Sequence, residues 1–210
     1  KKEGVLLIEV KEKNTNNFDG IIGYIPPGKD ESSGYVTGLV NISLRNLFGT
    51  GRAASIKWNK YNRNSQELDL RYLEPWLFSF PFNVNLGLYQ RIQDTTYVQR
   101  KIEGSLDYLA TEDISAGVMF ASETVVPTVR ANPVFTVYNS SYITTGANLK
   151  IDTRDDPYAP TEGILFINSY SFSIKTINGP VEYFTPSLST SVDLQRFASS
   201  FYFFYELFTR

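Results

Sequence analysis

The stretch Asp152-Thr-Arg-Asp-Asp-Pro-Tyr-Ala-Pro-Thr-Glu-Gly163 carries the sharpest local signal in the chain. Pro157 and Pro160 fix φ, remove two backbone donors and push the residue before each toward extended geometry, so neither a helix nor a strand continues through them. The two aspartates before Pro157 are suited to accept hydrogen bonds from nearby backbone amides, and Gly163 permits a conformation that other residues resist. The stretch therefore predicts a rigid, polar turn.

Apolar and polar residues alternate on both sides of this turn, which is the period of a β-strand with one apolar face. The apolar or neutral positions are Thr145, Ala147, Leu149 and Ile151 before the turn, and Ile164, Phe166, Tyr170, Phe172 and Ile174 after it, with Asn168 as the one lapse. Two amphipathic strands are predicted to meet at the turn.

The amino-acid composition limits the classes of function that this chain is expected to have. The chain has 210 residues, a net charge of -2, no Cys, no His, 14 Tyr and 15 Phe. Its length suits one large domain. A nucleic-acid partner is not expected, because no basic stripe is present. Without Cys or His the chain lacks thiolate chemistry, disulfides and the commonest metal ligand and general base, so we expect no enzyme activity, cofactor or metal.

Two further sequence features bear on class. No apolar run approaches the roughly 18 residues of a membrane helix, and no signal peptide precedes Lys1, which fits a mature or trimmed chain. Adjacent acids such as Asp155 and Asp156, or Glu112 and Asp113, superficially suggest glycoside or metal chemistry. Neighbouring acids in turns are usually solvated, so we assign them no catalysis.

The strand pattern recurs about eleven times along the chain, separated alternately by short turns and longer polar loops. A soluble sandwich also alternates, but with more charge on its polar face. A barrel in lipid turns its apolar face outward, and its closure pairs every backbone group. We therefore predict an all-β, transmembrane, antiparallel up-and-down β-barrel. The predicted strands are 18–24, 36–45, 54–59, 68–72, 84–88, 102–108, 114–120, 145–152, 164–174, 188–195 and 201–208.

Three motifs in order resemble the BamA/TamA superfamily of outer-membrane assembly barrels, the bacterial surface antigen family. They are Asn46-Leu-Phe-Gly-Thr-Gly-Arg52, Leu73-Glu-Pro-Trp-Leu-Phe78, and Asp152 to Pro157 with Pro160 to Gly163. In that family each falls at a periplasmic turn, and the loop parity places all three on one side. The resemblance implies structural periplasmic turns at Asn46, Gly49, Gly51, Arg52, Pro75, Asp152, Arg154, Asp155, Pro157, Pro160 and Gly163. For Asp152, Arg154 and Asp155, a turn held by ion pairs is favoured over a direct role in client handling.

The resemblance also implies a domain division. Residues 1–16 resemble the last strand of a POTRA repeat with its linker, and residues 17–210 the N-terminal part of the barrel. Family barrels have sixteen strands, and the loop after the eleventh, which carries an Arg-Gly pair, should begin near Arg210. We therefore expect a partial barrel of about eleven strands from a longer chain with POTRA repeats upstream. The alternative is that several copies complete one barrel.

The first barrel strand is the candidate functional element. In the family this strand pairs weakly with the last one, so the barrel opens sideways and offers an edge to a client strand. Gly20 and Gly23 either lower the cost of opening or relieve crowding at a barrel corner, and both interpretations stay open. The implied lateral-gate residues are Phe18, Asp19, Gly20, Ile21, Ile22, Gly23 and Tyr24.

Two further sets of residues have predicted positions. The predicted inward charges tune a pore or form pairs in a hydrated lumen; they are Arg45, Lys57, Arg71, Lys101, Glu103, Lys150 and Asp193. Aromatic residues near strand ends suit an interfacial girdle; they are Trp58, Tyr72, Trp76 and Tyr108.

The resemblance implies an outer-membrane assembly factor that inserts and folds β-barrel clients through a lateral gate, without covalent chemistry. The implied partners are outer-membrane lipids, unfolded barrel clients and accessory lipoproteins bound through POTRA repeats. A bacterial outer membrane is expected ahead of an organellar one. The alternatives are a two-partner secretion or TamA-like translocation barrel, and a passive porin or structural barrel.

Overall fold

The computed structural model describes residues 16–29, 32–94, 96–128, 137–157 and 159–206. Within these residues no helix has the length and apolar character needed to cross a membrane. The two short 3-10 helices are η1 (Leu77–Ser79) and η2 (Val181–Tyr183). The strands are β1 (Asn17–Ile25), β2 (Tyr35–Leu47), β3 (Arg52–Lys60), β4 (Gln66–Glu74), β5 (Phe82–Gln93), β6 (Tyr97–Leu109), β7 (Ile114–Pro127), β8 (Asn139–Asp152), β9 (Gly163–Gly179) and β10 (Ser191–Phe204).

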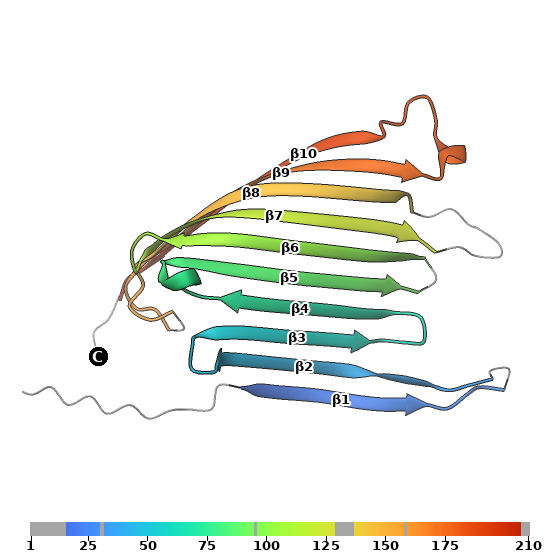
Figure 1. Cartoon of the computed structure of the whole chain (residues 1–210), viewed down its shortest axis with the longest axis horizontal. Coiled ribbons are helices and arrows are strands. Elements are labelled where there is room, and N and C mark those ends of the chain that lie inside the picture. The colour runs from blue at the N-terminus through green and yellow to red at the C-terminus, as the bar shows by residue number, and fades with distance from the viewer. Residues whose placement is uncertain (1–15, 30–31, 95, 129–136, 158, 207–210) are drawn as a thin grey trace, which may run out of the picture.

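All ten strands form one antiparallel sheet in which each strand pairs with its neighbours in the chain, in the order β1 to β10. Figure 1 shows them stepping across one curved sheet, with β1 and β10 at its two edges. This arrangement is an up-and-down partial barrel. The all-β antiparallel prediction is confirmed.

The described chain has ten strands where the sequence predicted about eleven. The parts of the predicted strands 188–195 and 201–208 that fall within 191–204 belong to one strand, β10, whose register with β9 continues without a break from Ser191 to Phe204. The alternation lapses between them, but backbone pairing does not depend on side-chain alternation. The predicted POTRA strand and linker at residues 1–16 lie almost wholly outside the described residues.

The connections divide between two edges of the sheet, left and right in Figure 1. The edge at which the strand ends are joined through 48–51, 75–81, 110–113 and 153–162 is here called the turn edge, and the edge at which they are joined through 26–34, 61–65, 94–96, 128–138 and 180–190 is called the loop edge. All three sequence motifs lie at the turn edge. The predicted alternation of lengths is loose, since 94–96 is a short connection on the loop edge and 153–162 a long one on the turn edge.

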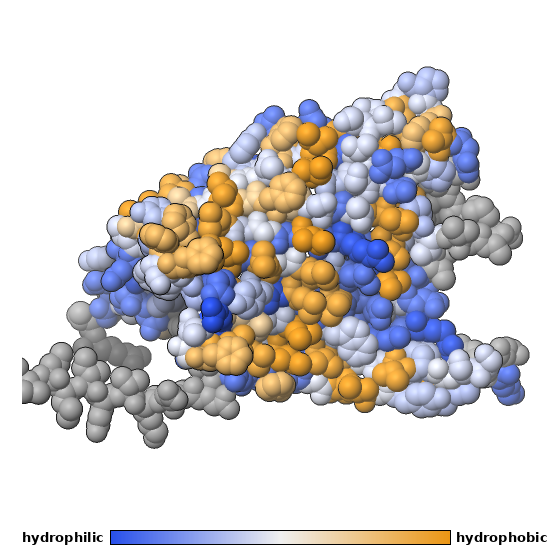
Figure 2. Space-filling view, viewed as in Figure 1, coloured by the Kyte–Doolittle hydropathy of each residue, from blue (hydrophilic) through white to orange (hydrophobic). Residues whose placement is uncertain are grey.

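The sheet has no conventional core. Among the described residues, Ala121 is the only buried apolar residue. The accessible surface is 15780 Å², against about 9,900 Å² for a compact soluble protein of this mass. Large apolar side chains such as Ile102, Val118 and Phe120 are exposed on one face of the sheet, and Figure 2 shows apolar side chains gathered across the middle of the face in view. This is the surface of a barrel wall that meets lipid.

The apolar band crosses the strands obliquely. Leu44 of β2 and Gln195 of β10 lie on one line drawn straight across the paired strands. On β2 the outward apolar residues, up to Ile42, lie between Leu44 and the loop edge. On β10 the outward residues Phe197, Phe201 and Phe203 lie between Gln195 and the turn edge. Residues opposite one another at this level are Leu44, Ala54, Tyr72, Leu86, Gly104, Phe120, Thr145, Phe172 and Gln195. From β2 to β10 the centre of the apolar band shifts along the strand direction by about nine residues, or about 30 Å. This shift occurs over eight spacings between neighbouring strands, each about 4.8 Å. That corresponds to a tilt of about 38°, within the range of about 35–45° for outer-membrane barrels.

The register of β10 corrects one predicted position. Asp193 was predicted to face inward, but it lies opposite Ile174 on the apolar face. The lipid-facing part of β10 begins at Phe197, so Asp193 lies between the apolar band and the loop edge. Its outward carboxylate is therefore outside the hydrocarbon layer.

Candidate functional site

The edge strand β1 pairs with β2 along its whole length, from Asn17 opposite Ser43 to Ile25 opposite Tyr35. Its other side has no strand partner within the described residues. Eight of its nine residues are exposed, and Gly23 is half-buried. The predicted gate residues therefore lie together in the first strand of the described sheet.

The two glycines of β1 differ in their surroundings. A Cβ on Gly20 would lie 2.9 Å from the Leu39 carbonyl oxygen, whereas one on Gly23 would make an ordinary contact of 3.6 Å with Thr37. Gly20 therefore relieves crowding against β2, and Gly23 has no steric requirement. The sequence interpretation overlooked the tightest contact of this pair of strands, which is at Gly38, with φ 150° and a Cβ position 2.1 Å from the Ile21 carbonyl oxygen.

The first turn motif is organised by Asn46. Its φ is 54°, its carbonyl accepts from the Gly49 N–H at 3.0 Å, and its side-chain Oδ1 accepts from the Gly51 N–H at 2.8 Å. Gly49 and Gly51 have φ of 71° and 77°, in the region that favours glycine. The residue types of the motif are therefore those that this tight turn requires.

The second motif is joined to the first by an ion pair. The Arg52 Nε and Nη2 atoms donate to the Glu74 carboxylate at 2.8 to 2.9 Å, and the Tyr72 hydroxyl donates to the same carboxylate. A Cβ on Gly51 would lie 3.3 Å from Pro75 Cγ. Sequence reasoning chose Arg52 and Pro75 but missed Glu74. Arg52 begins β3 and Glu74 ends β4, so opposite charges at the same end of two adjacent strands were the sequence signal that could have identified this pair.

The third motif is held by Asp152 and Arg154. The Arg154 guanidinium donates to both Asp152 carboxylate oxygens, at 2.7 and 2.9 Å, and to the Pro157 carbonyl at 2.9 Å. Lys150 Nζ lies 2.9 Å from Asp152. These contacts fix the start of the turn. They occupy all three guanidinium nitrogens of Arg154, so few donors remain for an external partner.

The far half of this turn closes on Asp155. Its carboxylate accepts from the Thr161 hydroxyl at 2.6 Å and from the Thr161 and Glu162 N–H groups at 2.9 and 3.1 Å. The Thr161 hydroxyl and these two amides hold the pKa of the Asp155 carboxyl well below its usual range. Pro160 precedes the segment 161–162 that donates these bonds, and Gly163 follows that segment with φ 109°.

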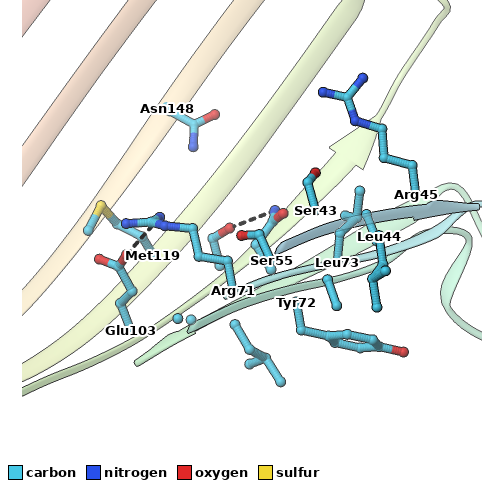
Figure 3. Close-up of a pocket in the computed structure, with 17 residues that line it drawn as sticks. Ser43, Leu44, Arg45, Ser55, Arg71, Tyr72, Leu73, Glu103, Met119 and Asn148 are labelled. Atoms are coloured by element: carbon cyan, nitrogen blue, oxygen red, sulfur yellow. Dashed lines mark hydrogen bonds and ion pairs between the residues drawn. The ribbon is translucent and has the colours of Figure 1, made fainter. Parts of the chain in front are cut away.

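The polar face of the sheet is concave. Residues from β2 to β8 line one cavity of about 500 Å³, among them Ser43, Arg71, Met119 and Asn148 (Figure 3). Arg71 points across this face to Glu103, with Nη1 to Oε1 at 3.2 Å, while Tyr72 projects from the opposite face. Lys101 also pairs with Glu103. The remaining predicted inward residues also lie on this face or line its hollows; they are Arg45, Lys57 and Lys150.

Glycines let polar side chains meet across an intervening strand on this face. Gly87 lies between Arg71 and Glu103, and a Cβ there would be 2.8 Å from Glu103 Cγ. Gly117 lies between Asp107 and Asn148, and the Asn148 Nδ2 atom donates to Asp107 Oδ1 at 3.3 Å. The described part of this face is therefore a network of paired polar groups.

The chain resembles known proteins both in structure and in sequence profile. The crystal structure of BamA from Haemophilus ducreyi lacking POTRA domains 1-3 is similar, with a TM-score of 0.48 and 15% sequence identity over 79% of this chain. The chain spans 37% of the length of that protein. No curated protein sequence matches. The profile of the Omp85 superfamily domain matches residues 46–203, which include all three turn motifs. The chain thus belongs to the Omp85 superfamily, and its resemblance to BamA/TamA-type barrels is confirmed.

Proposed function

We propose that this protein is a bacterial outer-membrane assembly factor that inserts and folds β-barrel clients along the β1 edge, without covalent chemistry. Its partners are outer-membrane lipids, unfolded barrel clients and accessory lipoproteins that bind POTRA repeats elsewhere in the full-length protein. Membership of the Omp85 superfamily supports an assembly or translocation role. The turn edge then faces the periplasm.

The proposal rests on the position of β1 as the first strand of an Omp85-superfamily barrel wall, in which β2 pairs with only one of its two edges. An edge strand presents unpaired N–H and C=O groups, and each such group is costly in hydrocarbon. The edge therefore pairs either with the strand that closes the barrel or with a strand of a client. Exchange between these two partners needs no external energy source, because each hydrogen bond lost to one strand is replaced by a bond to the other.

A disulfide lock tests this exchange. Ile22→Cys, combined with a cysteine in the strand that closes the barrel of the full-length protein, is expected to stop client insertion while the barrel stays folded, and a reductant should restore insertion. The matched control locks β1 to its permanent neighbour through Phe18→Cys and Ile42→Cys, which lie directly opposite. That control should insert clients normally. Normal insertion by the first lock would exclude lateral exchange at β1.

Depletion of the full-length protein separates the alternatives. A broad fall in other outer-membrane barrels supports assembly. Loss of a single exported protein with normal barrel levels would instead establish the secretion or TamA-like translocation role. Ion conductance by the purified barrel, with no change in either class of protein, would establish a porin or structural role.

A further inference from the structure

The lipid-facing wall carries a polar pair at the centre of its apolar band. Asn168 of β9 and Ser199 of β10 lie directly opposite one another on the outward face, and they are here called the polar rung. Asn168 is the residue at which the apolar alternation of β9 lapses. The other outward residues of this strand are Ile164 and Phe166 on its turn side, and Tyr170, Phe172 and Ile174 on its loop side.

Two aromatic rungs flank the polar rung along the same strands. Phe166 lies opposite Phe201, with ring centroids 6.4 Å apart, and Tyr170 lies opposite Phe197. Tyr170, Phe197 and Phe201 are exposed. The two short polar side chains therefore lie at mid-depth in the membrane, between two pairs of larger apolar rings.

The polar rung needs a hydrogen-bond partner at this depth. Among the described residues, neither the Asn168 amide nor the Ser199 hydroxyl makes a side-chain hydrogen bond. The amide has two N–H donors and a carbonyl acceptor, so a single bond to Ser199 would still leave a donor unpaired. Unpaired polar groups are costly in hydrocarbon, which contains neither water nor lipid headgroups. A partner for Asn168 must therefore be a protein group that reaches the centre of the band.

The chemistry of the amide favours a second copy of this protein as that partner. An asparagine amide is self-complementary, because each of two amides donates an N–H to the carbonyl of the other. Two copies inserted in the same direction are related by a twofold axis along the membrane normal, so surfaces at equal depth face each other. Asn168 of one copy then meets Asn168 of the other.

We infer that the outward face of β9 and β10 is the contact surface of a homodimer in the membrane, in which the two Asn168 amides pair at the centre of the band. The aromatic rungs pack around this pair. Lipid tails are as apolar as the rings, so the hydrogen bonds between the amides decide where the two copies meet. The surface lies at the other end of the described sheet from β1 (Figure 1), so the inference does not depend on the exchange proposed for that strand.

Energy transfer in vesicles tests this contact. The full-length protein carries a donor or an acceptor dye on a cysteine introduced as Glu182→Cys, at an exposed position of the loop edge. Both preparations are reconstituted together in phosphatidylcholine at graded dilution. We expect more transfer than between randomly distributed barrels. Asn168→Leu should weaken the association constant by about tenfold or more, because leucine has a similar size but no amide.

Two further variants serve as controls. Asn168→Gln keeps the amide and should retain most of the association. Ser122→Leu makes the same polar-to-apolar change on the outward face of β7, opposite Ile102 and away from the polar rung, and should leave the association constant unchanged.

Three outcomes would overturn the inference. Transfer no greater than that of randomly distributed barrels would show that the protein does not dimerise, and this result needs no variant to fold. Equal association constants for the parent and Asn168→Leu would place the contact elsewhere on the wall. An equal loss in Ser122→Leu would show that the effect of Asn168→Leu is not specific to the polar rung.

Discussion

At the scale of single residues, Gly163 is the most crowded of the glycines in the three turn motifs. A Cβ there would lie 2.3 Å from the Thr153 carbonyl oxygen and 2.8 Å from Arg154 Cα, both backbone atoms that cannot easily move. The φ of 109° is also strained for an L-residue. We expect Gly163→Val to lower the free energy of unfolding by about 1–3 kcal/mol, measured by urea denaturation of the vesicle-reconstituted protein.

The matched control for Gly163 is Gly104→Ala. A Cβ on Gly104 would meet Leu86 Cδ2 at 3.6 Å, an ordinary contact. This variant should unfold at nearly the parent urea concentration. An equal loss in both variants would show that any added side chain weakens the sheet and that the Gly163 backbone has no special role.

The Asp155 carboxylate should make the turn sensitive to acid. Its folded pKa is lowered by the Thr161 hydroxyl and by backbone N–H groups, so its contribution to stability is present above the unfolded pKa of about 3.9. That contribution is lost as pH falls from there through the folded pKa. Asp155→Asn should therefore be less stable than the parent at pH 7, and the difference should shrink below about pH 4. A difference that stays constant from pH 7 to pH 3 would contradict this assignment.

At the scale of elements, β7 depends on a glycine that links its two neighbours. A Cβ on Gly117 would lie 2.0 Å from Asp107 Oδ1 and 2.9 Å from Asn148 Nδ2. Gly117→Ala should rotate the Asp107 carboxylate away from Asn148 and cost about 1 kcal/mol, the value of one hydrogen bond. Urea unfolding measures this cost. Combining it with Asn148→Ala should add little, and full additivity would contradict the link.

Features local to one strand or turn were predictable from the sequence, whereas contacts between strands were not. Strand positions and the turns around Asn46 and Asp152 were predictable, because period-two alternation and the backbone preferences of Gly, Pro and Asn are local. The Arg52–Glu74 pair and the contact across Gly117 were not predicted. Both join residues more than twenty positions apart, and their proximity depends on the register between strands.

At the scale of the whole molecule, the two faces of the wall should respond oppositely to charge. Ala147 lies on the apolar face near the centre of the β8 band, and Ser169 lies on the concave face opposite Asn148. Ala147→Arg should destabilise the barrel in vesicles by about 2–4 kcal/mol, because the side chain is small and the cost is that of a charge in hydrocarbon. Ser169→Arg should have a much smaller effect. Urea unfolding checks both variants, and equal losses would contradict the assignment of faces.

The sequence by itself determined the class of this protein. Alternation, the absence of an apolar core pattern and the three turn motifs indicate a membrane barrel wall of the Omp85 superfamily, since each of these signals is local to a strand or a turn. The tertiary structure alone decided the depth of each residue. The register between β9 and β10 turned Asp193 outward, and small offsets between neighbouring strands add up to a tilt that placed it beyond the lipid band.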